Sequence, residues 1–170
     1  MQKHIVTTEF DNYLNNGAGA GLTARYLQRI NSSLNVDAAA GFTNGDRASN
    51  MRLGADLMLI PDYGRQPKVS IKGFLATESF DGDRINSFGM APTISKGFSF
   101  WGKEAFPYLA IPLSVNMNTE DNTYETTSAL ATGISGKLPF GENLVGNFAI
   151  NLPMRNSYTS FVFGISLPVQ

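Results

Sequence analysis

The sequence predicts an all-β chain that closes into one antiparallel up-and-down barrel of about ten strands, with eight strands as the alternative. Between Leu34 and Thr43 every second residue is apolar, as a strand with two different faces requires. The same alternation recurs along the chain and is interrupted at regular intervals by polar turn residues. Repeated about ten times, such a pattern favours a closed barrel, which leaves no sheet edge unpaired.

Ten segments show this pattern, and most are nine to eleven residues long. In chain order they are His4–Phe10, Gly21–Ile30, Leu34–Thr43, Met51–Ile60, Lys68–Thr77, Asn86–Phe98, Phe106–Asn116, Thr126–Leu138, Leu144–Leu152 and Ser160–Leu167. A tilted strand of about this length can cross a bilayer. Three prolines within or at the end of these segments, Pro92, Pro112 and Pro168, predict bulges because proline cannot donate to the strand ladder.

The connections fall into two classes that alternate along the chain. One class has its turns at residues 31–33, 61–67, 100–103 and 139–143. The other, at residues 12–20, 44–50, 78–85, 117–125 and 153–159, is expected to be longer and more polar. Outer-membrane barrels have short periplasmic turns and longer outer loops. The alternation also requires His4–Phe10 to be a strand, so that the strand number is even and both ends of the chain lie on the periplasmic side.

The residue types on the two faces predict that the apolar face points outward, into lipid. In Asn86–Phe98 one face carries Gly, Ala, Ser and Thr, while the other carries Phe88, Met90, Ile94 and Phe98. Charged residues are only 16% of the chain, below the roughly 25% of soluble domains, whose outer surface needs them. Small polar residues suit a narrow lumen. The expected fold is therefore a transmembrane β-barrel.

Charged residues within the strands fall mostly on the small-residue face. The expected lumen charge network consists of Glu9, Arg25, Arg29, Asp37, Arg52, Asp56 and Lys72. Several of them come out near mid-height on neighbouring strands, where opposite charges can pair. Two interpretations stay open, namely a network that only stabilises the lumen and a selectivity constriction in a pore.

Aromatic residues cluster at the strand ends, where a membrane barrel has interfacial girdles. The girdle expected near the first class of turns consists of Tyr63, Phe98, Phe100, Trp101, Phe106, Tyr108 and Phe140. A general preference of aromatic residues for strands and turn edges is the alternative explanation.

Composition predicts that residues 1–170 form a single domain without catalytic chemistry. The chain lacks Cys, and a net charge of -1 gives no electrostatic basis for binding nucleic acid. The one histidine, His4, has no Ser or acid pattern around it that indicates a catalytic triad. Loop acids such as Asp81 and Asp83 are better explained as turn residues than as Ca²⁺ ligands. We therefore expect no enzyme activity, no catalytic residue, no cofactor and no metal.

The overall pattern resembles the small outer-membrane β-barrel proteins of Gram-negative bacteria. The last expected strand keeps the alternation with Phe161, Phe163, Ile165 and Leu167, although the final aromatic residue common in that group is absent. The resemblance implies a bacterial outer-membrane location. It also implies contact with outer-membrane lipid, insertion by the β-barrel assembly machinery and a monomeric state.

The sequence is compatible with two functions. The first is an integral, porin-like outer-membrane barrel with a polar, largely filled lumen, acting as a structural or surface protein or as a narrow passive channel for ions and very small solutes. The alternative is a soluble, lipocalin-like barrel that binds an apolar ligand. The two differ in which face of the strands points inward.

Overall fold

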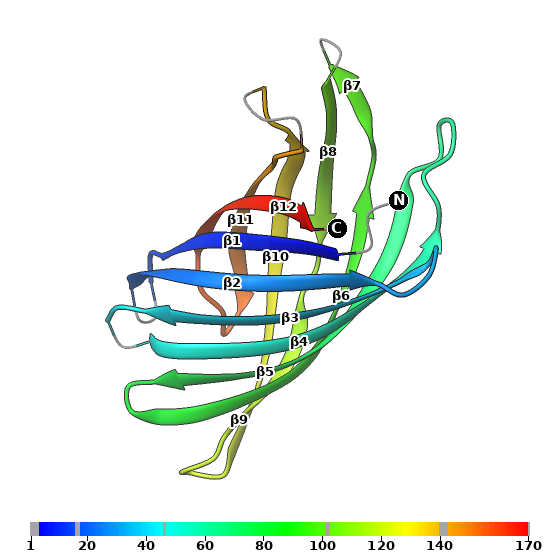
Figure 1. The fold of residues 1–170 in the computed structure, drawn as a ribbon. Helices are drawn as coiled ribbons and strands as arrows, with labels where there is room; N and C mark the ends of the chain where they lie inside the picture. The colour runs from blue at the N-terminus through cyan, green and yellow to red at the C-terminus, as the bar shows by residue number, and fades with distance from the viewer. Residues whose placement is uncertain (1–3, 16–17, 46, 101–102, 140–142, 170) are drawn as a thin grey trace.

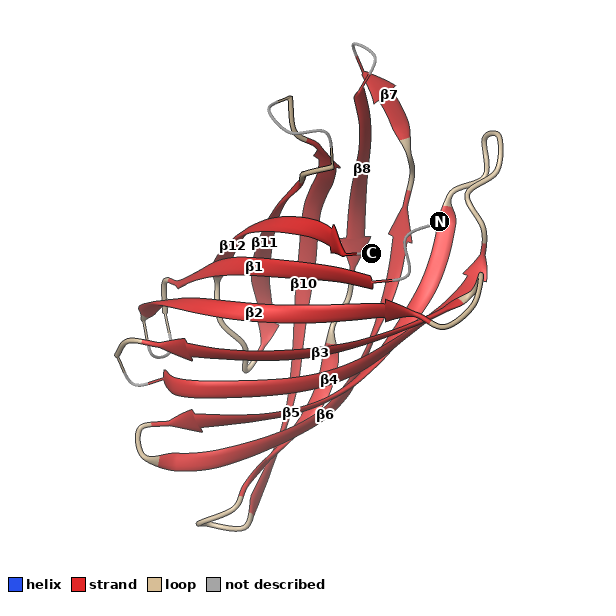
Figure 2. Ribbon diagram, viewed as in Figure 1, coloured by secondary structure: helices blue, strands red, loops and turns tan. Residues whose placement is uncertain are grey.

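The chain folds into one closed antiparallel β-sheet, as the computed structural model shows (Figures 1 and 2). The structure describes residues 4–15, 18–45, 47–100, 103–139 and 143–169. No helix long and apolar enough to span a membrane occurs among these residues. The strands are β1 (His4–Tyr13), β2 (Gly19–Arg29), β3 (Leu34–Thr43), β4 (Arg47–Ile60), β5 (Lys68–Phe80), β6 (Asp83–Ser95), β7 (Phe98–Phe100), β8 (Lys103–Ala110), β9 (Leu113–Asn118), β10 (Thr123–Lys137), β11 (Val145–Arg155) and β12 (Ser160–Val169).

These twelve segments make ten strands across the barrel wall, because two of the ten are interrupted. Segments β6 and β7 both pair with β8, and segments β8 and β9 both lie between β6 and β10. The second interruption falls at residues 111–112, where Pro112 has no N–H to donate. Pro92 and Pro168 pair in register within β6 and β12, so the bulges expected at these two prolines are absent. The predicted ten-stranded barrel is confirmed.

The first interruption is held by contacts from the connection between β4 and β5. The Lys96 ammonium donates to the Asp62 carboxylate and to the carbonyl of Gly64, and the Gly97 N–H donates to Asp62 over 2.7 Å. The hydrogen bonds from Lys96 and Gly97 lower the pKa of the Asp62 carboxyl below its ordinary value. These contacts join the connection between β4 and β5 to the interruption between β6 and β7, at the end of the barrel where His4 and Val169 also lie.

Pairing of the first and last described strands closes the barrel. Strands β1 and β12 pair without a register shift from His4 opposite Val169 to Tyr13 opposite Ser160. The expectation that His4–Phe10 is a strand is therefore confirmed. The end of the barrel that holds His4 and Val169 is called the near end below, and the opposite end the far end.

The connections at the far end are short, which corrects the expectation that they are the longer class. Strand β5 continues to Phe80 and β6 begins at Asp83, so that most of the expected 78–85 loop is paired strand. Asp81 and Gly82 form the turn, both with positive φ, as a tight hairpin turn requires. Polar side chains can face water while their backbone stays paired in a strand. An assignment of loops from polar residues alone therefore ended the strands too early. Loop length therefore does not distinguish the two ends.

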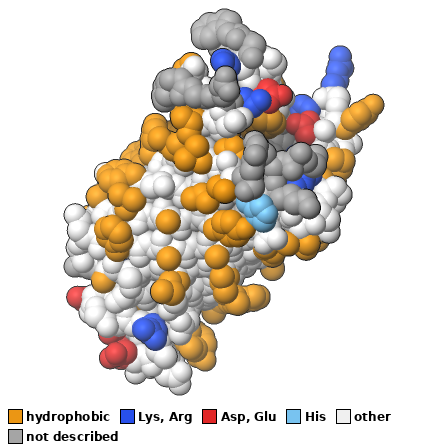
Figure 3. Space-filling model, viewed as in Figure 1, with side chains coloured by type: hydrophobic (Ala, Val, Ile, Leu, Met, Phe, Trp, Pro, Cys, Tyr) orange, Lys and Arg blue, Asp and Glu red, His pale blue; other side chains and the backbone are white. Residues whose placement is uncertain are grey.

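The two faces of the sheet differ as the alternation predicted, with apolar side chains outside and small or polar side chains inside. Figure 3 shows apolar side chains over the middle of the visible wall and charged ones near the two ends. Outward residues of β1 to β6 include Val6, Phe10, Leu22, Tyr26, Phe42, Met51, Leu53, Leu57, Ile71, Leu75, Phe88 and Met90. Buried residues include Thr7, Glu9, Asp11, Thr23, Asp37, Ala39, Ser70, Ala91, Ala110, Ala131, Ser160 and Ser166. A soluble barrel has the reverse arrangement, with its apolar side chains inside.

We predict that Ala38→Arg destabilises the protein in a bilayer by roughly 2–4 kcal/mol, because Ala38 is exposed on the outer face near the middle of β3. A spin label at Ala38 should be accessible to oxygen and shielded from a water-soluble relaxant. Its neighbour Ala39, which is buried in the lumen, provides the opposite-face control. Strong access of the water-soluble relaxant at Ala38 would contradict the outward, lipid-facing assignment.

Candidate functional site

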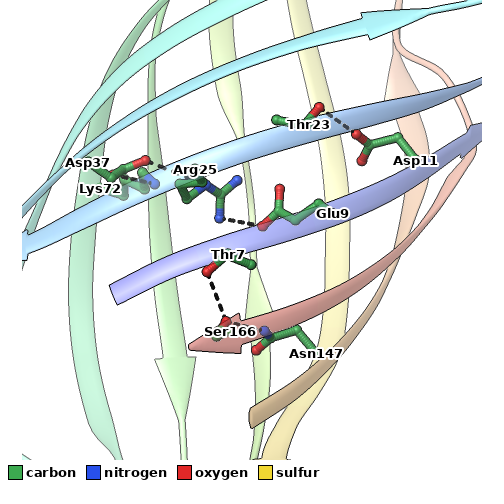
Figure 4. A network of polar contacts seen from close by, with 9 residues as sticks. All are labelled: Thr7, Glu9, Asp11, Thr23, Arg25, Asp37, Lys72, Asn147 and Ser166. Carbon is green, nitrogen blue, oxygen red and sulfur yellow. Dashed lines mark hydrogen bonds and ion pairs between the residues drawn. The ribbon is translucent and has the colours of Figure 1, made fainter. Parts of the chain in front are cut away.

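Charged side chains from four strands meet on the inner face of the barrel near mid-height (Figure 4). The Arg25 guanidinium lies 2.9 Å from Glu9, Nη1 to Oε1, and 3.7 Å from Asp37, Nε to Oδ2. Lys72 Nζ lies 2.7 Å from the other Asp37 oxygen, Oδ1. Glu9, Arg25, Asp37 and Lys72 thus form a continuous chain of alternating charge across β1, β2, β3 and β5. We call these four residues the ion-pair chain.

A glycine gives Lys72 access to Asp37 across the intervening strand. Asp37 is paired with Gly54 of β4. A Cβ at Gly54 would lie 2.6 Å from Asp37 Oδ1 and 2.7 Å from Lys72 Cε, closer than any side chain tolerates. The absent side chain therefore provides the space through which the ion pair spans β4. Any other residue at this position would displace one of the two partners.

Further hydrogen bonds extend the polar contacts from the ion-pair chain around the inner wall. The Thr7 and Ser166 hydroxyls lie 2.8 Å apart, and the Asn147 amide donates to Ser166 over 2.8 Å (Figure 4). On the other side of Glu9, the Thr23 hydroxyl donates to Asp11 over 2.8 Å. Buried polar groups need such partners, since an unpaired one destabilises the fold.

Three of the seven charges expected in the lumen network lie outside the ion-pair chain. Asp56 faces Lys68 at 3.7 Å, nearer the near end. Arg29 donates to the carbonyls of Asn31 and Ser32 in its own turn. Arg52 places its guanidinium carbon 4.2 Å from the centre of the Phe74 ring. Arg29 and Asp56 are therefore separate from the ion-pair chain, whereas the charge of Arg52 interacts with Glu9 and Asp37 without a close ion pair.

Tyr108, which was expected in the aromatic girdle, faces the lumen instead. It is paired with Gly133, where a Cβ would lie 2.7 Å from the Tyr108 hydroxyl oxygen. Four strands lie between β2 and β8 in either direction around the barrel, namely β3 to β6 one way and β1, β12, β11 and β10 the other way. Tyr108 of β8 therefore projects from the wall opposite Arg25 of β2. Its phenol interacts electrostatically with Arg25 and Glu9. The girdle position was predicted from the short distance to a turn, whereas the strand face decides the direction of the side chain.

The remaining girdle residues divide into three groups. Tyr63 and Phe98 are exposed at the near end, at 83% and 57%, as a girdle requires. Phe106 shares the strand face of Tyr108 and lies against Gly97, so its position also differs from the expected one. Trp101, Phe140 and the side chain of Phe100 lie outside the described part of the chain.

An arginine at the far end has a role that the sequence pattern did not reveal. Arg47 is buried, and its Nη1 lies 2.9 Å from Glu78 Oε2. Its guanidinium also lies 4.1 Å from the Tyr158 ring centre, 4.9 Å from Tyr13 and 5.2 Å from Phe80. These contacts hold the connection between β11 and β12 against β1, β4 and β5. Arg47 was expected in the 44–50 loop, which concealed its inward direction.

A polar cavity of about 620 Å³ occupies the far half of the lumen. Its lining extends from Glu9 and Arg25 at mid-height to Glu78, Asn156 and Tyr158 at the far end. Asp37 and Lys72 of the ion-pair chain are not part of the lining. The cavity therefore ends at the ion-pair chain and does not continue past it.

His4, the one histidine, lies at the near end. Its Nδ1 is 2.6 Å from the Tyr26 hydroxyl, and the two rings stack with centres 5.9 Å apart. In the described part of the chain, no group of three or more His, Asp or Glu side chains is placed to hold a metal ion.

Comparison with solved structures identifies the fold. The barrel is similar to an outer-membrane channel from Pseudomonas putida F1, with a TM-score of 0.55 and 10% identity over 98% of this chain and 94% of that one. A de novo designed transmembrane β-barrel gives 0.48 and 14% identity over 99% and 100% of the two chains, and a KdgM porin gives 0.43 and 9% over 98% and 99%. No protein-family model matches the chain, and no curated protein matches its sequence. The similarity to the Pseudomonas putida channel shows that the chain has the fold of an outer-membrane β-barrel.

We predict that Asp37→Asn lowers the free energy of unfolding by roughly 3–5 kcal/mol, because it leaves Lys72 without its carboxylate in the lumen. The matched control is Asp56→Asn, which alters a looser pair at 3.7 Å and should cost clearly less. Both values are measured by urea unfolding in lipid vesicles. An equal decrease in the free energy of unfolding of the two variants would show that the ion-pair chain does not stabilise the fold more than the Asp56–Lys68 pair does.

Proposed function

We propose that the protein is an integral outer-membrane barrel with a structural or surface role, whose lumen is closed at mid-height. The observation that carries this proposal is that charged and aromatic side chains point into the lumen from two opposite walls. The ion-pair chain lies along β1 to β5, and Tyr108 extends from β8 toward Arg25 and Glu9. Glu9 and Arg25 lie at the boundary of the polar cavity, whose lining does not include Asp37 or Lys72. Such a barrel passes at most ions and very small solutes.

The distribution of polarity supports placement in a membrane over the soluble alternative. A lipocalin-like barrel keeps its apolar residues inside, around the ligand. Here the inner face holds Glu9, Asp11 and Asp37, while Phe42, Phe88 and Phe163 are more than half exposed outside. The proposal includes a bacterial outer-membrane location, outer-membrane lipid and the β-barrel assembly machinery as partners, and a monomeric state. It includes no nucleic-acid partner and no enzymatic activity.

A narrow passive channel is the second candidate, and the cavity favours it. The cavity of about 620 Å³ is polar and already occupies the far half of the lumen. In this candidate, movement of the Tyr108 ring away from Arg25 and Glu9 widens the level of the lumen beyond the cavity. Side-chain rotations of this kind occur without any change in the barrel backbone.

We predict small or absent single-channel currents for the native protein in planar bilayers, and steady openings for Tyr108→Ala. Removing the phenol withdraws the one described aromatic group that projects toward Arg25 from the opposite wall. The control is Tyr26→Ala, which truncates a tyrosine on the outer face and should leave the conductance unchanged. Large, steady currents through the native protein would favour the channel over the closed barrel.

We also propose that the far end faces the outside of the cell, with both ends of the described chain on the periplasmic side. Epitope tags inserted at Gly45 and Asn122 should then be detected on intact cells, since both lie in far-end turns where the backbone has positive φ. A tag at Ser33, in the turn between β2 and β3 at the near end, should be detected only after permeabilisation. The reverse labelling would place the barrel in the opposite orientation.

A further inference from the structure

Two inward arginines flank a small side chain on the floor of the cavity. Arg25 of β2 is paired with Ala39 of β3, and Ala39 is paired with Arg52 of β4. Since neighbouring strands lie about 4.8 Å apart, the two arginine backbones are separated by about 10 Å. The methyl group of Ala39 leaves the space between the two long side chains unfilled. All three residues line the cavity.

Among the described residues Arg52 forms no close ion pair, although the carboxylates of Asp37 and Glu9 interact with its charge from more than 4.0 Å away. Among the described residues, no carboxylate lies within 4.0 Å of its guanidinium, and its buried Nε has no hydrogen-bond partner. Its contact with the Phe74 ring covers one flat face of the guanidinium. Stacking of this kind leaves the N–H groups at the edge available for an anion.

The nearby carboxylates already have partners. Glu9 is bound by Arg25, and Asp37 is bound by Lys72 and lies near Arg25. Asp11 accepts the Thr23 hydroxyl. The charges of Arg25 and Lys72 balance those of Glu9 and Asp37 in close ion pairs, whereas the guanidinium of Arg52 has no close ion pair at this level of the lumen among the described residues.

We propose that a small anion, a halide ion or the carboxylate of a short organic acid, binds between Arg25 and Arg52 above Ala39. The edge of the Arg52 guanidinium supplies charged N–H donors, and Arg25 supplies a second positive charge from the other side of Ala39. The cavity gives the anion a path from the far end. The inference rests on the polar lumen of the proposed function but does not require conduction, so binding and conductance are tested separately.

The test is the ³⁵Cl NMR line width of chloride with the purified protein in a non-ionic detergent. Saturable broadening that acetate displaces is the expected result. Arg52→Gln should weaken chloride binding by about tenfold or more, since it removes a charged hydrogen-bond donor. Arg29→Gln is the matched control, because Arg29 donates to turn carbonyls away from the cavity and should leave the broadening unchanged. Absence of saturable broadening, or full broadening in Arg52→Gln, would overturn the proposal.

A second variant keeps the test decisive if Arg52→Gln fails to fold. Ala39→Glu places a carboxylate between the two arginines, where the anion is proposed to bind. This variant should abolish the chloride-dependent broadening and should raise the thermal midpoint of the protein in chloride-free buffer. A folded Ala39→Glu protein that still broadens the chloride line as the native protein does would show that the anion binds elsewhere or not at all.

Discussion

The pairing of every strand with two neighbours is the constraint on which the rest of the structure depends. A bilayer offers no hydrogen bonds to the backbone, so a spanning sheet must close on itself. The contact between β1 and β12 provides this closure over ten residue pairs. Closure fixes an inside and an outside, and the period-two alternation then sends apolar side chains to the outer face. The narrow interior receives alanine, serine, threonine and paired charges, as the ion-pair chain shows.

Most of the fold could be predicted from the sequence, because alternation is a direct consequence of strand geometry. The pattern located all ten strands, including the first one, and placed Asp81 and Gly82 within a turn. It ended the strands too early at the far end, since polar residues in paired strands look the same as polar residues in loops. Bulges were also expected at Pro92 and Pro168, where the pairing continues, and the interruption occurs only at Pro112 among the three.

The candidate site was harder to predict from the sequence, because its contacts depend on register and on opposite walls. The contacts of Arg25 with Glu9 and Asp37 follow from the positions of these residues on adjacent strands. The reach of Lys72 across Gly54 depends on an absent side chain, whose importance emerges only once two strands are in register. The inward direction of Tyr108 places it opposite β2, and no local pattern relates residues that far apart in the sequence.

In the closed barrel that we propose, the cavity in the far half of the lumen makes the two halves of the barrel electrically unequal. A space of about 620 Å³ that fills with water would have a higher permittivity than the level at which the ion-pair chain closes the lumen. A voltage applied across this proposed barrel in a membrane would therefore fall mainly over the closed level and not over the full height of the barrel. The side chains of Glu9, Arg25 and Tyr108 lie at this level, where the local field is strongest. A charged side chain that moves a short distance at this level would cross a larger fraction of the applied voltage than the same movement elsewhere in the barrel.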